Sequence, residues 1–317
     1  MFTATSNFLK KSSAFYSITR NFSQIKIPLP EYQVHNFNIK DLPTETTTNK
    51  EELLEYYKDI AGLRRMEVTM DNLYKQREIR GFCHLYDGQE AICLGIEKAC
   101  NLDDCLITAY RDHCQARVRG YSVHQIMAEM MGKKTGATKG KGGSMHFYRK
   151  AGNFYGGHGI VGAQTPMGVG LAFALKYKQK PNIAITMYGD GASNQGQLFE
   201  GANIAKLWNL PCIFICENNQ FGMGTSNERA SANTTYFKKL DMANVPGMLI
   251  DGHNVFAVRE GMRFAKKYAI ENGPVCIEMK TYRYHGHSMS DPGVTYRTRE
   301  DVSNIRKTKD CVNYIKQ

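Results

Sequence analysis

Short apolar runs that end at Gly or Asn recur in the second half of the chain and predict the strands of a parallel sheet. Four such runs lie at residues 183–188, 211–216, 247–250 and 274–280. Apolar residues at helical spacing between the first two runs predict a crossover helix, and another is expected at about 256–270. This alternation predicts an α/β fold with a doubly wound, mostly parallel sheet and helices on both faces.

Two helices in the first half carry start signals. Thr48 with Glu51 matches a capping box and precedes a long stripe of apolar positions. Ser122 with Gln125 matches a second capping box, followed by apolar residues at helical spacing. Both segments are therefore predicted as helices that pack against the sheet.

A glycine-rich segment precedes the first strand. Residues 136–170 hold 11 of the 29 glycines and read as a long loop whose backbone must approach something closely. Within it, Gly168-Val-Gly170-Leu-Ala-Phe173 approximates a dinucleotide-binding fingerprint. That fingerprint requires a preceding apolar strand, which is missing here. The segment is predicted instead to be a helix with small residues that packs tightly against a neighbour.

Two polar motifs end neighbouring predicted strands. Gly189-Asp190-Gly191 follows the first run, and Asn218-Asn219 follows the second after 26 intervening residues. The carboxyl ends of neighbouring parallel strands are where open α/β sheets bind ligands. A carboxylate and an amide oxygen that converge there suit Mg²⁺, which prefers oxygen ligands and leaves positions for phosphate oxygens. Either half alone is more often an ordinary turn, so the prediction depends on the pair.

Composition narrows the class of protein. The chain of 317 residues, 42% hydrophobic, can bury one large or two modest cores, and it has no apolar run long enough to span a membrane. The net charge of +11 is not gathered into one basic stripe, so an anionic cofactor or acidic partner explains it as well as nucleic acid does. Nine cysteines without a C-x-x-C pair indicate reduced, buried thiols.

The N-terminal composition predicts a targeting segment. Residues 1–22 contain no acidic residue and three basic ones, and they lack a continuous apolar stretch, which is typical of a mitochondrial transit peptide. Cleavage is expected after Phe22. Residues 23–47, with three prolines, are predicted as an extended arm, and residues 48–317 as the α/β domain.

The motif at 189–219 resembles the thiamine diphosphate-binding motif. Three more segments resemble the α subunits of the mitochondrial thiamine diphosphate-dependent 2-oxoacid dehydrogenases, and the similarity runs from about residue 50 to 310. They read RGFCHLYDGQE (80–90), KGKGGSMH (139–146) and TYRYHGHSMSDPG (281–293). The branched-chain members share the cofactor motif, but the last run is not expected in them as written here.

The resemblance implies a function for the chain and for named residues. The implied reaction is oxidative decarboxylation of pyruvate at thiamine diphosphate, with acetyl transfer to the lipoyl group of an acetyltransferase component. Mg²⁺ would be held by Asp190, Asn219 and the backbone carbonyl of Phe221, a position where the family often has Tyr. The remaining implied cofactor contacts are Tyr110, Arg111, Gly159, Val161, Gly191, Ala192 and His287.

The resemblance also implies two active-site histidines, His287 and His84, whose physical roles would be hydrogen bonding to diphosphate or substrate carboxylate and proton handling. His285 could exchange roles with His287, and the sequence does not separate them. One departure from the family lies nearby: Cys114 stands where Gly is usual.

Partners follow from what the chain lacks. No second α/β domain supplies the glutamate that activates the aminopyrimidine, so the resemblance implies a β subunit and an α₂β₂ heterotetramer in the mitochondrial matrix. The family continues for several dozen helical residues beyond the position of Gln317, which suggests a C-terminal truncation. No nucleic acid or membrane partner is expected.

Regulation by a kinase and a phosphatase is also implied. Ser288 corresponds to the inactivating phosphorylation site, and its polar loop is expected to be accessible. Thr295 and Ser226 correspond to two further sites, the former with Thr in place of Ser. Alternatives are the α subunit of a branched-chain 2-oxoacid or acetoin dehydrogenase, or a non-catalytic paralogue.

Overall fold

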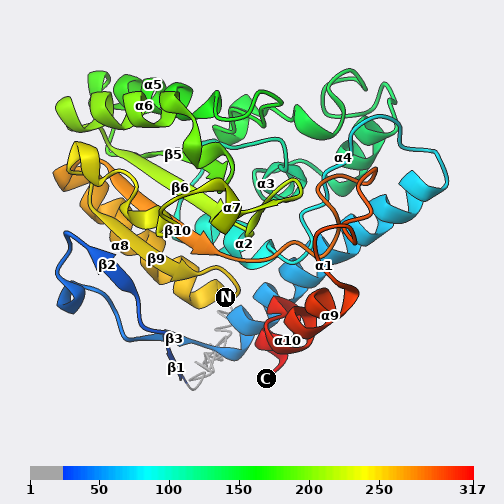
Figure 1. Cartoon of the computed structure of the whole chain (residues 1–317), viewed down its shortest axis with the longest axis horizontal. Coiled ribbons are helices and arrows are strands. Elements are labelled where there is room, and N and C mark those ends of the chain that lie inside the picture. Colours follow the sequence, from blue (N-terminus) through cyan, green and yellow to red (C-terminus); the bar gives the residue numbers. More distant parts are fainter. Residues whose placement is uncertain (1–23) are drawn as a thin grey trace, which may run out of the picture.

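The computed structural model describes residues 24–317, so the predicted transit peptide lies outside the described residues. Its centre is a six-stranded sheet in the order β2-β9-β10-β6-β5-β4, in which every pairing is parallel except that of β2 with β9 (Figure 1). The strands of this sheet are β2 (Gln33–His35), β4 (Cys105–Ile107), β5 (Ala184–Gly189), β6 (Cys212–Asn218), β9 (Gly247–Asp251) and β10 (Val275–Lys280). The predicted fold class is confirmed.

Helices cover both faces of this sheet (Figure 1). Side chains of β5 and β6 alternate between two cores: Ile185 and Ile213 belong to the core that includes α8, whereas Ala184 and Phe214 belong to the core that includes α5 and α6. The helices are α1 (Lys50–Lys75), α2 (Glu90–Ala99), α3 (His113–Val118), α4 (Val123–Met130), α5 (Gln164–Tyr177), α6 (Gly196–Leu207), α7 (Asn227–Ala230), α8 (Val255–Asn272), α9 (Arg299–Thr308) and α10 (Cys311–Lys316).

The four predicted strands are found, each shifted by at most two residues, and both crossover helices are confirmed as α6 and α8. The predicted helix with small residues is α5, and a Cβ built on its Gly168 would lie 2.5 Å from the Cβ of Thr186 in β5. Strand β4 was missed because three residues are too few to show a pattern.

The two predicted capping boxes have different outcomes. Ser122 caps α4 with the reciprocal bonds to Gln125 that define the box. For α1 the prediction is wrong by one residue, since the Asn49 side chain accepts from the Glu52 N–H. The Thr48 hydroxyl instead donates to the Glu52 carboxylate at 2.6 Å. An Asn directly after Thr competes for the cap, because both side chains accept well there.

The predicted arm adds strands at the edge of the domain. Strand β1 (Ile25–Pro28) pairs with β3 (Glu45–Thr48), and β2 extends the central sheet. A further small hairpin, β7 (Phe221–Gly222) with β8 (Thr225–Ser226), follows the second half of the cofactor motif. Residues 24–47 thus include short extended strands, and one of these strands, β2, belongs to the central sheet.

The glycine-rich loop ends at α5, which begins at Gln164, so the predicted loop is too long at its C-terminal end. Part of its backbone folds around a carboxylate. Glu129 accepts hydrogen bonds from the backbone N–H groups of Thr138, Gly140, Gly142 and Gly143, at 2.8 to 3.1 Å. The close approach that the glycines predict is, in this part, an approach to Glu129.

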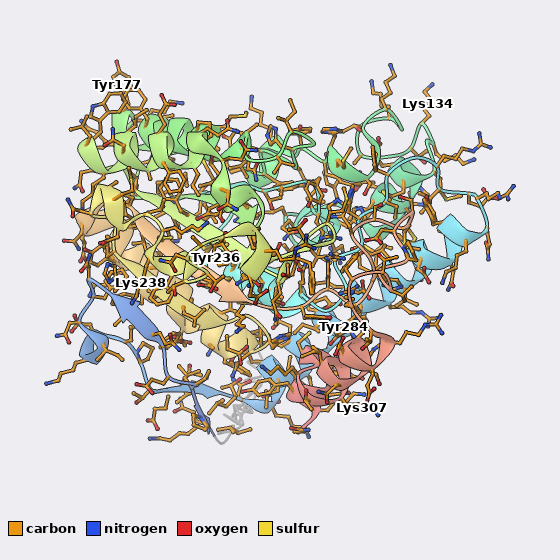
Figure 2. All side chains as sticks on the ribbon, in the orientation of Figure 1. Lys134, Tyr177, Tyr236, Lys238, Tyr284 and Lys307 are labelled. Atoms are coloured by element: carbon orange, nitrogen blue, oxygen red, sulfur yellow. The ribbon has the colours of Figure 1, made fainter. Side chains whose placement is uncertain are left out.

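All nine cysteines are free thiols, and eight are buried, as the sequence predicts. Tyr236 lies in the interior, whereas Tyr177 and Lys134 extend from the surface (Figure 2). None of the helices in residues 24–317 is long and apolar enough to cross a membrane.

Candidate cofactor site and active site

The two halves of the cofactor motif meet at one edge of the sheet. Asp190 directly follows β5, Asn219 directly follows β6, and these two strands pair in parallel. A Cβ built on Gly191 would lie 3.3 Å from the Cα of Gly222, so the loops after the two strands are in contact. The two halves of the motif, about 30 residues apart in the sequence, are therefore neighbours in the fold.

The environment of the Asp190 carboxyl group suits the binding of a cation. Its side chain is buried, and its Oδ2 atom has no hydrogen-bond partner within residues 24–317. Burial raises the pKa of this carboxyl group to about 6. A buried carboxylate oxygen without a partner is costly unless a positive charge compensates it.

The amide of Asn219 is oriented by a residue that sequence reasoning missed. Its Nδ2 donates to the Oε1 of Gln89 at 3.0 Å, which fixes the amide, while its Oδ1 accepts only a long bond of 3.4 Å from the Phe221 N–H. The oxygens of Asp190 and Asn219 thus fit a hard cation such as Mg²⁺. Within the described residues there is no group of three or more His, Cys, Asp or Glu that could hold a metal.

The proposed active-site histidines come together although about 200 residues separate them. The ring centroids of His84 and His287 lie 5.2 Å apart, edge to face, and those of His84 and Tyr110 lie 4.5 Å apart. Tyr110 and His287 are 5.4 Å apart. The three rings therefore form one cluster, and Phe82 stacks on its outer side.

Arg111 is buried beneath this cluster. Its guanidinium donates to the carbonyl of Leu85 at 2.6 Å and to that of His287 at 2.9 Å. Burial lowers its pKa, but no carboxylate forms an ion pair with it within residues 24–317. A buried cation that bonds only neutral carbonyls retains the capacity to balance the charge of a phosphate or carboxylate.

Both histidines are electrically neutral in the site at pH 7. Burial, aided by the charge of Arg111, lowers the pKa of His84 to about 2 and that of His287 to about 4. A neutral imidazole can accept a proton from a reacting group or donate a hydrogen bond, depending on its tautomer. The same positive field favours anions in this part of the site.

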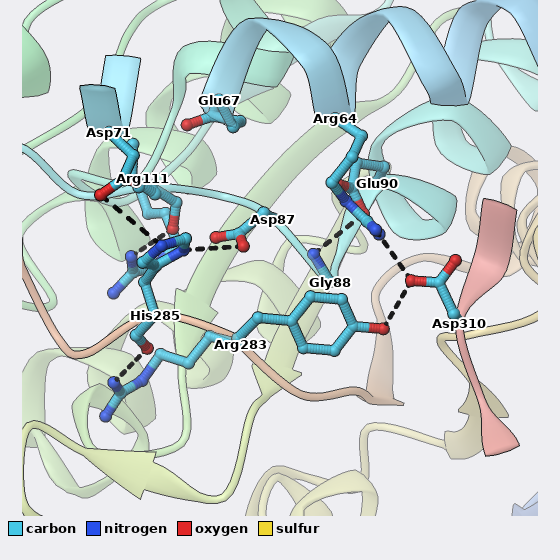
Figure 3. Close-up of polar contacts among 12 residues, drawn as sticks. Arg64, Glu67, Asp71, Asp87, Gly88, Glu90, Arg111, Arg283, His285 and Asp310 are labelled. Atoms are coloured by element: carbon cyan, nitrogen blue, oxygen red, sulfur yellow. Dashed lines mark hydrogen bonds and ion pairs between the residues drawn. The ribbon is translucent and has the colours of Figure 1, made fainter. Parts of the chain in front are cut away.

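His285 has a different environment from His287. Its Nδ1 lies 2.8 Å from the Asp87 carboxylate and its Nε2 lies 3.7 Å from that of Asp71 (Figure 3). The hydrogen bond to Asp87 raises the pKa of His285 despite its burial. This geometry supports His287 rather than His285 as the histidine beside His84.

The loop that carries these histidines is held to the helices by charged groups. Arg64 of α1 pairs with Glu90 of α2 and with Asp310, which also accepts a bond of 2.9 Å from Tyr284 (Figure 3). The sequence segment before α10 is thereby tied to the active-site loop. These contacts depend on residues almost 250 positions apart, so no local pattern could reveal them.

Two other predicted cofactor contacts remain open to solvent. Gly159 and Val161 lie on an exposed stretch of the glycine-rich loop, with Val161 45% exposed. Ala192 is buried beside the Asp190 turn, where the Ser193 hydroxyl donates to the Asp190 carbonyl at 2.5 Å. The aminopyrimidine contacts therefore stay a prediction.

A buried carboxyl group near the site was not predicted. Glu217 in β6 shares a short hydrogen bond with the Tyr86 hydroxyl, and burial raises its pKa to about 7. Arg111 and Asp190 both influence its charge. The only sequence signal was an acidic residue inside an apolar strand, which is rare without a buried partner.

The three residues expected to be phosphorylated differ in exposure. Ser288 is only 6% exposed, and its hydroxyl lies 2.8 Å from that of Ser290, so the expected accessibility is wrong for this conformation. The loop is tight at this point because Asp291 accepts the His287 N–H at 2.7 Å. Thr295 is exposed, and Ser226 is half-buried at the start of α7.

With this geometry described, the chain can be compared with known proteins. The family model described as "Dehydrogenase E1 component" matches residues 58–317. The chain is similar to mitochondrial pyruvate dehydrogenase E1 component subunit alpha of Solanum tuberosum, with 51% identity over 99% of this chain and 81% of the relative. The corresponding values are 52%, 97% and 78% for the human somatic form, and 50%, 98% and 82% for the Dictyostelium discoideum protein.

The fold and the site define a thiamine diphosphate-dependent α/β protein with its cofactor motif at the carboxyl ends of β5 and β6. The chain belongs to the dehydrogenase E1 component family, whose members use thiamine diphosphate. The family resemblance expected from the sequence is confirmed.

Proposed function

We propose that this chain is the α subunit of a mitochondrial pyruvate dehydrogenase. It would act in the oxidative decarboxylation of pyruvate, with transfer of the acetyl group to the lipoyl arm of an acetyltransferase component. The observation that carries this proposal is the convergence of Asp190 and Asn219 on neighbouring strand ends, in a chain about half identical to relatives with that name.

In this proposal Mg²⁺ is bound by Asp190, Asn219 and the Phe221 carbonyl, and it neutralises the diphosphate. The fit rests on the unpartnered Asp190 oxygen and on the fixed amide of Asn219. Arg111 adds positive charge beside the same anion. When bound, the thiamine ring system supplies the electron sink that decarboxylation of a 2-oxoacid requires.

The histidine cluster would handle substrate and protons. Neutral His84 and His287 can hydrogen bond to the substrate carboxylate or move a proton during acetyl transfer, with Tyr110 packed against both rings. Gly159, Val161, Gly191 and Ala192 would contribute backbone and apolar contacts to the cofactor. These roles are supported by the cluster's position beside Arg111.

The proposed assembly includes a β subunit, because no residue of this chain is expected to activate the aminopyrimidine. The expected complex is an α₂β₂ heterotetramer in the mitochondrial matrix that delivers acetyl groups to the lipoyl-bearing component. The relatives carry the names of α subunits of a mitochondrial enzyme, which supports both the assembly and the location.

The test is reconstitution with a pyruvate dehydrogenase β subunit, followed by thiamine diphosphate titration with and without Mg²⁺. We expect Mg²⁺-dependent cofactor binding and decarboxylation of pyruvate, with much slower turnover of branched 2-oxoacids. Faster turnover of branched substrates would assign the chain to the related enzyme. Cofactor binding without turnover of either substrate would favour a non-catalytic paralogue.

Phosphorylation by a kinase, reversed by a phosphatase, is proposed at Ser288, and also at Thr295 and Ser226. A phosphate on Ser288 adds about −1.5 to −2 charges beside the site of the diphosphate. Because Ser288 is buried, the 285–293 loop must open to accept it, and repulsion would then keep the loop open. Full acetyl transfer by a complex phosphorylated stoichiometrically at Ser288 would rule this switch out; Ser290→Ala serves as the control for the neighbouring hydroxyl.

A further inference from the structure

A chain of buried polar side chains lies behind the active-site cluster and has no part in the function proposed above. The Glu67 Oε2 of α1 lies 3.1 Å from Nδ1 of His113 in α3. The Nε2 of the same ring lies 2.7 Å from Oγ of Ser144 in the glycine-rich loop. Ser144 Oγ in turn accepts the backbone N–H of His84 at 3.1 Å.

With Glu67 as a carboxylate, one arrangement of protons satisfies all of these hydrogen-bonding groups. The His84 N–H can only donate, so Ser144 Oγ accepts it and directs its own proton elsewhere. An ionised Glu67 only accepts, so His113 carries its proton on Nδ1, and Nε2 is left to accept the Ser144 hydroxyl. All donors therefore point along the chain toward one carboxylate.

Cys114 completes the environment of that carboxylate. Its thiol lies 3.5 Å from the second oxygen of Glu67, and burial together with the charge of Glu67 raises the pKa of the thiol. The thiol therefore stays protonated and donates to Glu67. This gives a physical role to Cys114.

Burial strengthens these hydrogen bonds and makes the loss of any one of them destabilising. The side chains of Glu67 and His113 are fully buried, and Ser144 is 4% exposed. In a region of low dielectric constant each bond is strengthened, and loss of one partner leaves another polar group unsatisfied. These linked hydrogen bonds thus hold α1, α3, the glycine-rich loop and the His84 segment in one fixed arrangement.

The ring of His84 depends on this anchor. Its Nδ1 is buried and has no hydrogen-bond partner in the described part of the chain, so the ring is held by packing against Tyr110, His287 and Phe82. The direct polar bond of this residue to the glycine-rich loop is that of its backbone N–H to Ser144. A shift of the backbone would move the ring against its neighbours.

We propose that Glu67, His113 and Ser144 are positioning residues that set the place of the His84 imidazole through the hydrogen bond that the His84 backbone N–H donates to Ser144 Oγ. The proposal rests on the proposed function only in that His84 acts in the reaction. Ser144 is its direct contact, His113 orients the hydroxyl of Ser144, and Glu67 fixes the tautomer of His113.

The order carboxylate, imidazole and hydroxyl is also that of serine hydrolases. Two observations oppose a nucleophilic role for Ser144. The hydroxyl oxygen already accepts the His84 N–H, and the residue is almost inaccessible although it borders a cavity of about 670 Å³. Labelling of Ser144 by a fluorophosphonate probe in the folded full chain would overturn the positioning role, and we expect none.

The functional test is a double-mutant cycle in the complex reconstituted with a β subunit. We expect Ser144→Ala to lower kcat for acetyl transfer by about 10- to 100-fold, the range typical of a misplaced catalytic group, with little change in thiamine diphosphate affinity. In a His84→Asn background the same substitution should have no further effect, because it acts through His84. Additive losses would contradict the proposal.

Two variants separate positioning from general destabilisation. Tyr32→Phe removes one buried hydroxyl hydrogen bond, that to the Ala257 carbonyl, far from the site. Both Tyr32→Phe and Ser144→Ala lose buried hydrogen bonding and should lower Tm, but Tyr32→Phe should leave kcat unchanged. Cys114→Ser keeps a donor to Glu67 and should retain activity, whereas His113→Phe should reproduce the kcat loss of Ser144→Ala. A kcat loss in Tyr32→Phe equal to that in Ser144→Ala would show a merely structural effect.

A second readout does not depend on activity. In the full chain with ¹³C-labelled histidine Cε1, the His84 resonance, assigned by its absence in His84→Asn, should shift in Ser144→Ala and in His113→Phe, but not in Tyr32→Phe. An unshifted His84 resonance would refute the positioning role. If His84→Asn leaves acetyl transfer unchanged, the proposed role of His84 fails, and this resonance alone decides the positioning claim.

Discussion

At the scale of single residues, the molecule keeps charged and ionisable groups buried without their usual partners, and these groups mark the site. Among the residues that the structure describes, one Asp190 oxygen has no partner and Arg111 bonds only carbonyls, while His84 and His287 have depressed pKa values. Such groups lower stability in the free protein and gain compensating charge when an anion and a cation bind.

The first prediction concerns Asp190. Asp190→Asn should abolish measurable Mg²⁺-dependent thiamine diphosphate binding, because it removes the charged metal ligand while keeping the size of the side chain. Calorimetric titration in Mg²⁺ and in EDTA measures this. The control is Asp241→Asn, an exposed carboxylate that pairs with His35. An unchanged Mg²⁺-dependent affinity for thiamine diphosphate in Asp190→Asn would contradict the assignment of Asp190 as a metal ligand.

The second prediction is a pH dependence. The pKa of His84 is about 2 in the folded chain, against 6.5 for an unperturbed histidine, so between pH 6.5 and 2 the unfolded chain binds more protons at this residue. Its contribution to stability is therefore present above pH 6.5 and is lost as the pH falls. We expect the contribution of His84 to the unfolding free energy to decrease on acidification from pH 7 to 4.

The variant His84→Asn isolates this effect. It should flatten the decrease by up to about 1.4 kcal/mol per pH unit, the linkage limit for one proton. His124→Asn, at an exposed histidine, is the matched control and should leave the slope unchanged. Denaturant titrations at several pH values provide the measurement. Equal slopes for His84→Asn and the unmodified chain would contradict the assigned pKa shift.

At the scale of secondary-structure elements, α5 lies close to β5, the strand that precedes the proposed metal ligand Asp190. The approach is possible because Gly168 has no side chain: a Cβ there would lie 2.5 Å from the Cβ of Thr186. On the outer side of the same helix, Gly170 faces open space. The two glycines have the same helical backbone and opposite surroundings.

This contrast gives the third prediction. Gly168→Ala should lower the unfolding free energy by about 1–3 kcal/mol, because the strand side chain cannot move aside easily. Gly170→Ala should raise it by about 0.5–1 kcal/mol, because alanine favours a helix and meets no neighbour. Denaturant unfolding of both variants tests the pair. Similar effects at the two positions would show that the close packing of α5 on β5 is wrong.

At the scale of the whole molecule, the residues of the proposed active site gather at one edge of the sheet. Its proposed metal ligands, arginine and histidines lie on loops at one edge of the sheet, and Val161 on the neighbouring loop is exposed. A surface of this kind, with buried charges and an exposed loop, is suited to a partner subunit that closes the site. The proposed β subunit would do this.

The fourth prediction follows. The purified chain alone should show no pyruvate decarboxylation, since no residue in it is expected to activate the aminopyrimidine, and addition of a β subunit should restore turnover. Release of CO₂ from labelled pyruvate is the measurement, and an α subunit with Asp190→Asn plus β is the negative control. Clear turnover of pyruvate by the single chain would contradict the proposal that it acts only together with a β subunit.

Local sequence information was enough for the parts of this protein that depend on nearby residues. The alternation of apolar runs predicted four strands and their crossover helices, and the capping box at Ser122 predicted the start of α4. The adjacency of the two motif halves was also expected, because consecutive strands of a parallel sheet are often neighbours, as β5 and β6 are here. Strand β4 was not predicted because three residues are too few to show a pattern. The cap of α1 was placed one residue too early because Thr48 and Asn49 are both suitable cap residues.

Tertiary structure alone decided which distant side chains meet. His285 and His287 are two positions apart in the sequence but have different neighbours in the fold. His287 lies beside His84, whereas His285 lies beside Asp87 and Asp71. Likewise Gln89 orients Asn219, Ser288 is buried, and Glu67, His113 and Ser144 form one chain of hydrogen bonds. The physical reason is that periodicity and capping act over a few residues, whereas burial and hydrogen-bond partners depend on packing between segments far apart in the sequence.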